Sequence, residues 1–339
     1  PCTTLNYTVT VKNTGNMGDD NYDLTVSDTK GWGPTLDNYR LENIPQGENR
    51  TTMLRVHIPE NAIGCTNDYI TVTATSRADN TVKDNDACIA HAKIVRGVEV
   101  SISPSENTGV PCTTLEYTVT VRNTGNVDDN YLLSWTDNAG WGDNISLSGN
   151  WLLVPRRGEN TAKLLVHIPT HVRGCTYDNI TVTATCKENT LVKDNASCLA
   201  HVAIVRGVDV SILPSYQSGL NGETLDYTVT VSNTGNVEDT YSIAAVDNTG
   251  WAPTVSPTLL TVPPWSSGTA TLSVTVPENA IGCTEDNVIV TATSQTDNTV
   301  KDNDSCIAHA IEKVVGWDAF IAATFSGGSD DAIFGVRPD

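Results

Sequence analysis

Short runs of alternating apolar and polar residues are the first pattern along the chain. Apolar side chains occupy every second position over residues 5–11, 54–58 and 70–75. Such alternation places one face of a β-strand in a core and the other in water, whereas an amphipathic helix has a period near 3.6. The pattern therefore predicts an all-β chain with next to no helix.

These runs return at a fixed spacing along the chain. The run Leu5-Asn-Tyr-Thr-Val-Thr-Val11 recurs at 115–121 and 225–231, each time followed closely by Asn-Thr-Gly-Asn, a turn sequence. A fixed period indicates that one structural unit is repeated, and several short strands in about 100 residues are typical of an Ig-like sandwich. We predict three tandem Ig-like β-sandwich domains with a C-terminal strand-like tail, at 1–96, 97–206, 207–315 and 316–339.

Several strings in the repeat resemble a known class of module. They are Tyr-Thr-Val-Thr-Val-x-Asn-Thr-Gly-Asn, a Gly-Trp pair, and Pro-Glu-Asn-Ala-Ile-Gly at 59–64 and 277–282. Together they are similar to the tandem Ig-like (fibronectin- or CARDB-like) repeats of archaeal and bacterial cell-surface proteins, over residues 1 to about 315. The resemblance implies an extracellular scaffolding or adhesive role, in an archaeal protein, and it carries no catalytic residue.

The second and third repeats begin with an additional strand that the first repeat lacks. Residues 97–102 and 207–212 precede the Leu-x-Tyr runs, whereas Pro1 aligns with Pro111, after that strand. The missing pattern of Gly, apolar, acid, apolar, any, Ile occurs after the third repeat, at 316–321. We expect this tail to complete the first repeat of a neighbouring copy by donor-strand complementation, which builds a head-to-tail filament.

The expected contacts follow from alternation within the tail. The assembly residues are Trp317, Ala319, Phe320, Ile321 and Phe325, with the odd-numbered side chains of 317–321 directed inward and Phe320 at the subunit rim. The predicted partner is an identical subunit, so the chain would form a homopolymer. The alternative is that residues 1–339 are a window of a longer repeat array, an adhesin or carbohydrate-binding stalk with cell-surface or glycan partners, or one appended to a hydrolase.

Charge and motifs narrow the function classes. Forty acidic against twenty basic residues give a formal charge of −20, which would repel nucleic acid. The chain has no apolar run near the roughly 18 residues of a membrane span. It also lacks a nucleophile elbow, a P-loop and a zinc-protease motif, so we expect no enzyme, no catalytic residue and no resident metal. Acidic loops such as Asp19-Asp20 and Asp84 with Asp86 are candidate calcium sites, although a solvated acidic face explains them better.

Cysteines and glycosylation acceptors indicate an oxidising, extracellular setting. Each repeat holds two cysteines at the same spacing, and we predict disulfides among Cys65, Cys88, Cys175, Cys198, Cys283 and Cys306, within the repeats or, alternatively, between neighbouring repeats or subunits. Cys2, Cys112 and Cys186 remain unassigned. Six Asn-x-Ser/Thr sequences are candidate glycan sites: Asn6, Asn49, Asn144, Asn179, Asn195 and Asn303.

Overall fold

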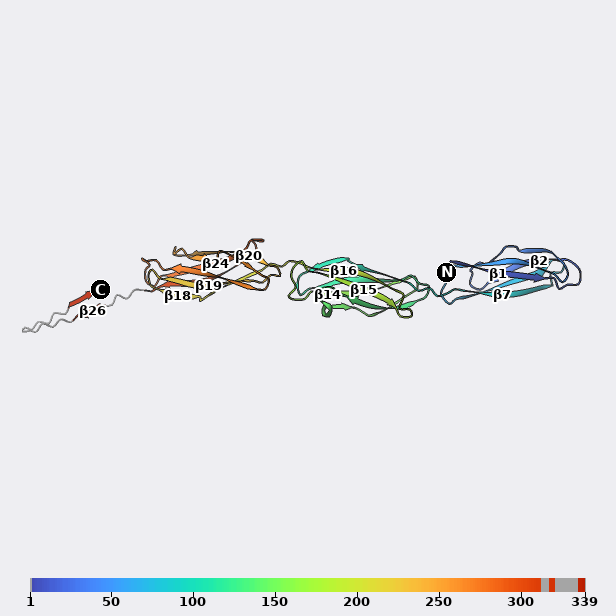
Figure 1. Cartoon of the computed structure of the whole chain (residues 1–339), viewed down its shortest axis with the longest axis horizontal. Helices are drawn as coiled ribbons and strands as arrows, with labels where there is room; N and C mark the ends of the chain where they lie inside the picture. Colours follow the sequence, from blue (N-terminus) through green and yellow to red (C-terminus); the bar gives the residue numbers. More distant parts are fainter. Residues whose placement is uncertain (1, 312–316, 321–334, 339) are drawn as a thin grey trace, which may run out of the picture. The chain divides into compact units, whose positions relative to one another are not determined.

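The chain is built almost wholly of β-strands (Figure 1). The structure is a computed structural model that describes residues 2–311, 317–320 and 335–338. Within these ranges the only helical turn is the short 3-10 turn Gly142–Asn144, and no helix is long and apolar enough to cross a membrane. The all-β prediction is confirmed, and the sheets form three sandwiches in sequence order.

Contacts along the chain group it into two compact units. The first comprises 1–107, 114–167 and 177–200, and the second comprises 108–113, 168–176 and 201–339. The boundaries between units fall inside the second repeat rather than at its ends, so the domain limits at 96, 206 and 315 stay predictions. Each repeat is described below by its own sheets.

The first repeat has a three-stranded and a four-stranded sheet. The smaller sheet has the order β1-β5-β3, and the larger has the order β4-β2-β6-β7. The strands are β1 (Thr3–Lys12), β2 (Asp20–Asp28), β3 (Thr35–Leu36), β4 (Arg40–Ile44), β5 (Asn49–Ile58), β6 (Asn67–Ser76) and β7 (Lys83–His91).

The second repeat has two more strands than the first. Its sheets have the orders β12-β14-β10-β8 and β13-β11-β15-β16-β9. The strands are β8 (Val98–Ser103), β9 (Glu106–Gly109), β10 (Thr114–Asn123), β11 (Asp129–Thr136), β12 (Ile145–Leu147), β13 (Trp151–Val154), β14 (Glu159–His167), β15 (Tyr177–Cys186) and β16 (Lys193–Val202).

The third repeat has the same arrangement as the second. Its sheets have the orders β17-β19-β23-β21 and β18-β25-β24-β20-β22. The strands are β17 (Val208–Leu213), β18 (Tyr216–Gly219), β19 (Thr224–Asn233), β20 (Asp239–Asp247), β21 (Thr254–Ser256), β22 (Leu259–Val262), β23 (Ser267–Thr275), β24 (Glu285–Ser294) and β25 (Lys301–Ala310).

The tail contributes two short strands. β26 (Trp317–Phe320) pairs antiparallel with β27 (Gly335–Pro338), and Trp317 lies opposite Pro338. Three of the predicted assembly residues, Trp317, Ala319 and Phe320, therefore lie on β26. The other two, Ile321 and Phe325, lie outside the described residues.

The apolar side chains of the predicted alternating runs fill the cores of the sandwiches. Tyr117 and Val119 on β10 are fully buried, as are Tyr227 and Val229 on β19, because every second side chain of these strands faces the opposite sheet. The tyrosine hydroxyls reach β16 and β25 in that sheet, where Tyr117 Oη donates to Leu199 O and Tyr227 Oη donates to Ile307 O. These bonds satisfy the buried hydroxyl groups across the sandwich.

The predicted disulfides are not formed, and strand register explains why. All nine cysteines lie within the described residues and are thiols, including Cys65, Cys88, Cys175, Cys198, Cys283 and Cys306. The N–H of Cys65 donates to the carbonyl of Ala92, which lies beyond the end of β7, whereas Cys88 lies opposite Ile70. The two cysteines are thus separated by several strand residues, or about 10 Å or more.

A disulfide needs Cα atoms within about 7 Å of each other. Pairing within a repeat is therefore wrong as a prediction. Pairing between repeats through Cys198 or Cys306 is prevented because both side chains are buried in the cores of their own repeats.

Candidate functional site: an edge groove in the first repeat

A single segment covers one side of the sandwich in the second and third repeats. We call 98–109 and 208–219 the first-strand segments. In the second repeat, β8 pairs antiparallel with β10 and the chain then passes to the other sheet, where β9 lies beside β16. In the third repeat, β17 pairs with β19 and β18 pairs parallel with β25. Each segment thus closes the edges of both sheets.

The corresponding edges of the first repeat border an open groove. β1 and β7 are the edge strands there, and a groove of about 900 Å³ lies between them. Residues 6–12 of β1 and 82–88 at β7 form its walls, with core side chains such as Leu54 and Val72 below them. We call this feature the edge groove. It occupies the position that the first-strand segments fill in the other repeats.

The core is more exposed along the edge groove than at the same positions elsewhere. Val9 and Ala74 are half-buried and line the groove. Their counterparts in the second repeat, Val119 and Ala184, are fully buried. Since apolar surface favours removal from water, an added strand with apolar side chains would be stabilised here.

Carboxylates hold the first-strand segments by their main chain. Asp302 and Asp304 on β25 accept hydrogen bonds of 2.8 Å from the N–H groups of Val210 and Ile212, respectively. In the second repeat, Asp194 accepts the equivalent bond from Val100, also at 2.8 Å. An ionised acceptor makes such a bond stronger than a neutral one.

The same carboxylates are present at the edge groove. Asp84 and Asp86 of β7 correspond to Asp302 and Asp304, line the groove and are exposed. Asp86 Oδ1 accepts from the N–H of Ala87, just as Asp304 Oδ1 accepts from Ser305. The first repeat thus presents the acceptor set that binds a first strand in the third.

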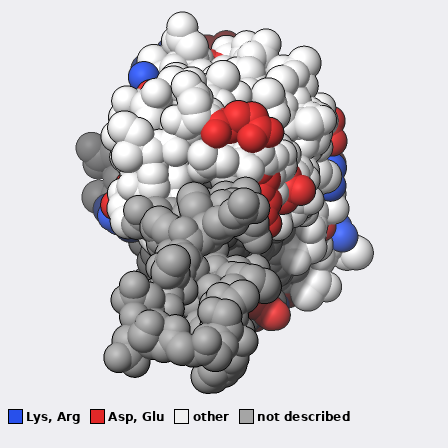
Figure 2. Space-filling view, turned by 90° about the vertical axis from the view of Figure 1, so that its left-hand side faces the viewer, with Lys and Arg blue, Asp and Glu red and all other residues white. Residues whose placement is uncertain are grey.

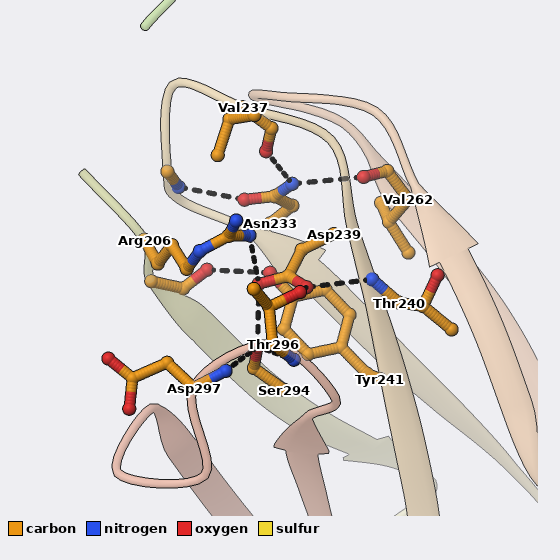
Figure 3. A network of polar contacts seen from close by, with 12 residues as sticks. Arg206, Asn233, Val237, Asp239, Thr240, Tyr241, Val262, Ser294, Thr296 and Asp297 are labelled. Atoms are coloured by element: carbon orange, nitrogen blue, oxygen red, sulfur yellow. Dashed lines mark hydrogen bonds and ion pairs between the residues drawn. The ribbon is translucent and has the colours of Figure 1, made fainter. Parts of the chain in front are cut away.

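A buried polar network fixes the start of each first-strand segment. In the third repeat, Arg206 forms an ion pair of 3.0 Å with Asp239, which is also bonded to Ser294 (Figure 3). Tyr241 Oη donates to the carbonyl of Gly207, 2.9 Å away. Burial, followed by the charge of Asp239, raises the pKa of Tyr241 to about 12, so this hydroxyl stays a donor at neutral pH.

The second repeat has the same ion pair and the same tyrosine bond, with Cys186 in place of Ser294, and the first repeat has the residues that would receive the arginine and the glycine carbonyl. Arg96 pairs with Asp129, as Arg206 does with Asp239. In the first repeat, Asp20 accepts from Ser76 Oγ at 2.5 Å, and Tyr22 Oη donates to Asn13 Oδ1 at 3.2 Å. Tyr22 thus makes an internal bond where its counterparts bind the glycine carbonyl of a first-strand segment.

The acidic residues named above as candidate calcium sites have structural roles. Asp20 and its counterparts belong to the network at the strand start, and Asp84 and Asp86 border the groove. No cluster of three metal-ligating side chains occurs in the described part of the chain. On the face shown in Figure 2, Asp and Glu side chains form small separate groups on a mostly uncharged surface.

The candidate glycan sites lie where a sugar has access to solvent in five cases of six. Asn6, Asn49, Asn179, Asn195 and Asn303 are exposed on strands, and Asn144 is half-buried in the 3-10 turn. Attachment of glycan stays a prediction.

Sequence reasoning missed the residues that position the first-strand segment. Arg206 and Asp239 are far apart in the sequence, and nothing in their local sequence indicates that they pair. The available signal is the repeat, since Arg96 and Asp129 recur at the same spacing. Comparing the repeats residue by residue also identifies Asp84 and Asp86 as the counterparts of Asp302 and Asp304.

No protein-family model matches the chain, and no curated protein does. Among solved structures, it is similar to the protocadherin GammaB4 extracellular domain at 12% identity and a TM-score of 0.44, covering 94% of this chain and 48% of that one. Mouse cadherin-23 EC22-24 matches at 14% identity and a TM-score of 0.38, covering 86% of each chain. A Porphyromonas gingivalis W83 protein of unknown function matches at 13% identity and a TM-score of 0.25, covering 62% of this chain and 99% of that one. The chain thus spans about half of the protocadherin, and we draw its function from the edge groove instead.

Proposed function

We propose that the chain is an extracellular structural subunit whose copies join head to tail, in a filament or surface layer, by donating residues 317–325 to the edge groove of the next copy. One observation carries the proposal. The edge groove lies where the other two repeats hold a first-strand segment, and it presents an apolar floor and the two carboxylates that bind this segment in the third repeat. No catalytic residue takes part, and the role is mechanical.

Alignment on glycine sets the register of the donated strand. Gly316 corresponds to Gly97, so Ala319 corresponds to Val100, which lies opposite Val121. Transferred to the first repeat, Ala319 would lie opposite Val11 and Ile321 opposite Val9. The N–H groups of Ala319 and Ile321 would then donate to Asp84 and Asp86, as the equivalent N–H groups donate to Asp302 and Asp304 in the third repeat.

The side chains of the donated strand match the groove. Ile321 takes the position of Ile212, which is 2% exposed, and burial of such a side chain contributes about 1.5–3 kcal/mol. Phe320 takes the position of Ser101 and Ser211, both exposed, and would stay at the rim. The main-chain ladder adds affinity, since backbone bonds and alternating pockets are what strand addition uses.

The extracellular setting rests on surface chemistry. Five of the six glycan acceptors are exposed, and the chain carries a net charge of −20, which favours solubility. Glycan on exposed strands would also hinder unwanted edge pairing.

A register-specific cross-link tests the joint. Thr120 lies opposite Ser101, so a Thr10→Cys, Phe320→Cys variant should place the two new thiols opposite each other between copies. The exposed native cysteines are replaced by serine in this background. Under mild oxidation we expect a ladder of covalent oligomers on non-reducing gels. The matched control is Thr8→Cys, Phe320→Cys, whose residues would be diagonal neighbours about 7–8 Å apart and should cross-link much less.

Other outcomes select other functions. A cross-link confined to single chains would overturn head-to-tail assembly. Absence of any cross-link, with the full chain monomeric at high concentration, would favour a repeat stalk of an adhesin or of a hydrolase, in which other residues occupy the edge groove.

A further inference from the structure

The contact between the first and second repeats centres on one asparagine. Asn126, which is 2% exposed, accepts a 3.0 Å bond at its carbonyl from the N–H of Gly64. Its side-chain Nδ2 donates to the carbonyls of Ala62 and Lys93, and its Oδ1 accepts from the N–H of Val95. One buried residue therefore binds both the 59–65 loop and the linker of the preceding repeat.

The contact between the second and third repeats uses three of these four bonds. Asn236, also 2% exposed, accepts at its carbonyl from Gly174 at 2.9 Å. Its Nδ2 donates to Ala203 O at 2.9 Å, and its Oδ1 accepts from Val205 N at 2.8 Å. The recurrence of the same bonds at two repeat boundaries marks a built contact, which we call the asparagine joint.

The glycine in each asparagine joint has too little space for a side chain to enter without displacing its neighbours. A Cβ at Gly64 would lie 2.7 Å from Val127 Cγ1 and 3.2 Å from Ile94 Cα. A Cβ at Gly174 would lie 3.0 Å from Asn236 Oδ1. The close approach of the loop to the next repeat therefore depends on glycine at this position.

The first and third repeats each present one half of this joint on an exposed surface. Asn16 corresponds to Asn126 but is exposed, and Met17, the counterpart of Val127, is 94% exposed. The Ala280-Ile281-Gly282 sequence repeats Ala62-Ile63-Gly64, and Ile281 is 79% exposed against 45% for Ile63. The two halves are complementary, and they lie on different repeats.

We infer that these two surfaces form a third asparagine joint, between two copies of this chain. The N–H of Gly282 in one copy donates to the carbonyl of Asn16 in the next, and Asn16 Nδ2 donates to the carbonyl of Ala280. The Ala280 carbonyl already accepts one hydrogen bond from Asn221 Nδ2 at 3.1 Å, and its second lone pair is free to accept from Asn16.

This inference rests on the proposed function and deepens it. β25, the last strand before the tail, ends at Ala310, whose carbonyl accepts from the N–H of Cys283, the residue after Gly282. The joint and the donated strand would therefore act on the same neighbouring copy, and the joint would set the orientation of the two copies. The partner is a second copy, since this chain carries both complementary halves.

A further contact makes the internal joints stronger than the joint between copies. At the first joint Arg157 forms an ion pair of 3.3 Å with Glu60, and at the second Trp265 packs edge-on against His171 at 5.4 Å. Gly47 is the counterpart of Arg157 and Trp265. Since glycine offers neither a charge nor a ring, the joint between copies keeps the asparagine bonds and lacks this contact.

The test uses the Thr10→Cys, Phe320→Cys chain, because its cross-link reports strand donation independently of the asparagine joint. In that background under reducing conditions, Asn16→Ala and Gly282→Val should each weaken association in sedimentation velocity by about ten-fold or more. The first removes the side-chain hydrogen bonds of the joint, and the second adds a side chain where the internal joints have too little space for one.

Asn279→Ala is the matched control, because Asn279 is exposed beside the joint and its counterpart Asn61 makes none of the bonds described above. Its other counterpart, His171, contacts Trp265 at the second joint, and the place of Trp265 is taken by Gly47 in the joint between copies. After oxidation at high concentration, the covalent ladder should persist in all three variants.

Each result has a defined consequence. Association at the parent strength in both Asn16→Ala and Gly282→Val would overturn the joint while leaving strand donation intact. A parent that fails to cross-link would instead reject the proposed function.

A gain-of-function variant adds an independent check. Arg157 has a φ of 56° and Gly47 a φ of 82°, so an arginine already occupies this left-handed conformation at the first joint. Gly47→Arg should pair with Glu278 as Arg157 pairs with Glu60, and should tighten association at low salt but not at about 1 M salt. No gain at low salt would count against the joint.

Discussion

The backbone N–H of Gly64 donates a 3.0 Å hydrogen bond to the carbonyl oxygen of Asn126, and these residues belong to successive repeats. The bond exists because Gly64 has no Cβ, which lets its backbone approach the next repeat. Asn126 also binds Val95 in the linker, so the loop and the linker are held together. Repeats joined in this way are coupled by specific polar contacts and not only by a flexible chain.

Replacement of Gly64 tests that coupling. Gly64→Val should displace the loop from Val127 and Asn126 and cost about 1–3 kcal/mol, the usual range for overpacking. We expect faster proteolysis of the linker at 93–97 and a lower first transition in calorimetry. Gly149→Val is the control, because a Cβ there would meet only Trp151 O, at 4.0 Å. Equal effects of the two substitutions would contradict the role of the joint.

A peptide tests the edge groove independently of assembly. In the Ile321→Asp variant of the full chain, an added peptide of residues 316–325 should stabilise the first repeat. At 100 times its Kd a ligand adds about 2.7 kcal/mol, which raises the Tm of a domain of this size by about 10 °C or more. A peptide with the same Ile321→Asp change should have little effect. A Tm that neither peptide changes would argue against a strand-binding groove.

Thiol reactivity should separate the cysteines by burial. Burial, followed by the charge of Asp178, raises the pKa of Cys198 to about 12, and burial with Asp286 raises that of Cys306 to about 12. Few of these thiols are ionised at pH 8, whereas Cys65, Cys175 and Cys283 are exposed. Iodoacetamide should therefore label the exposed set first in the native chain, as mass spectrometry would report. Rapid native labelling of Cys198 would contradict the buried position.

The carboxyl group of Asp178 should titrate at a higher pH than an ordinary aspartate. Burial raises the pKa of Asp178, although hydrogen bonds from the N–H groups of Ala139 and Asn138 lower it in part. Because its folded pKa exceeds the unfolded one, the protonated form favours folding. This contribution is complete below the unfolded pKa and is lost as pH rises through the folded pKa. NMR titration should find its midpoint above that of Asp297, whose pKa is lowered by bonds from Thr299. The reverse order would refute the assignment.

The local sequence pattern was sufficient to predict the long strands but not the short strands at the edges of the sheets. Alternation at 115–121 predicted the strand that became β10, and residues 97–102 predicted β8. The short strands β9 and β18 were not predicted, because they have no clear alternation and pair only after the chain changes sheet. The cysteine spacing was misleading for a related reason: a constant spacing in sequence does not set which residues face each other across β6 and β7.

The sequence by itself determined the all-β class, the threefold repeat and the alternation that assigns Tyr117 and Val119 to a core, because periodicity is a local property of the chain. Only the tertiary structure decided that Cys88 lies opposite Ile70, that Arg206 meets Asp239, and that Asn126 binds Gly64. These contacts join residues that are distant in the sequence, and their partners are set by strand register and by the packing of sheets rather than by neighbouring residues.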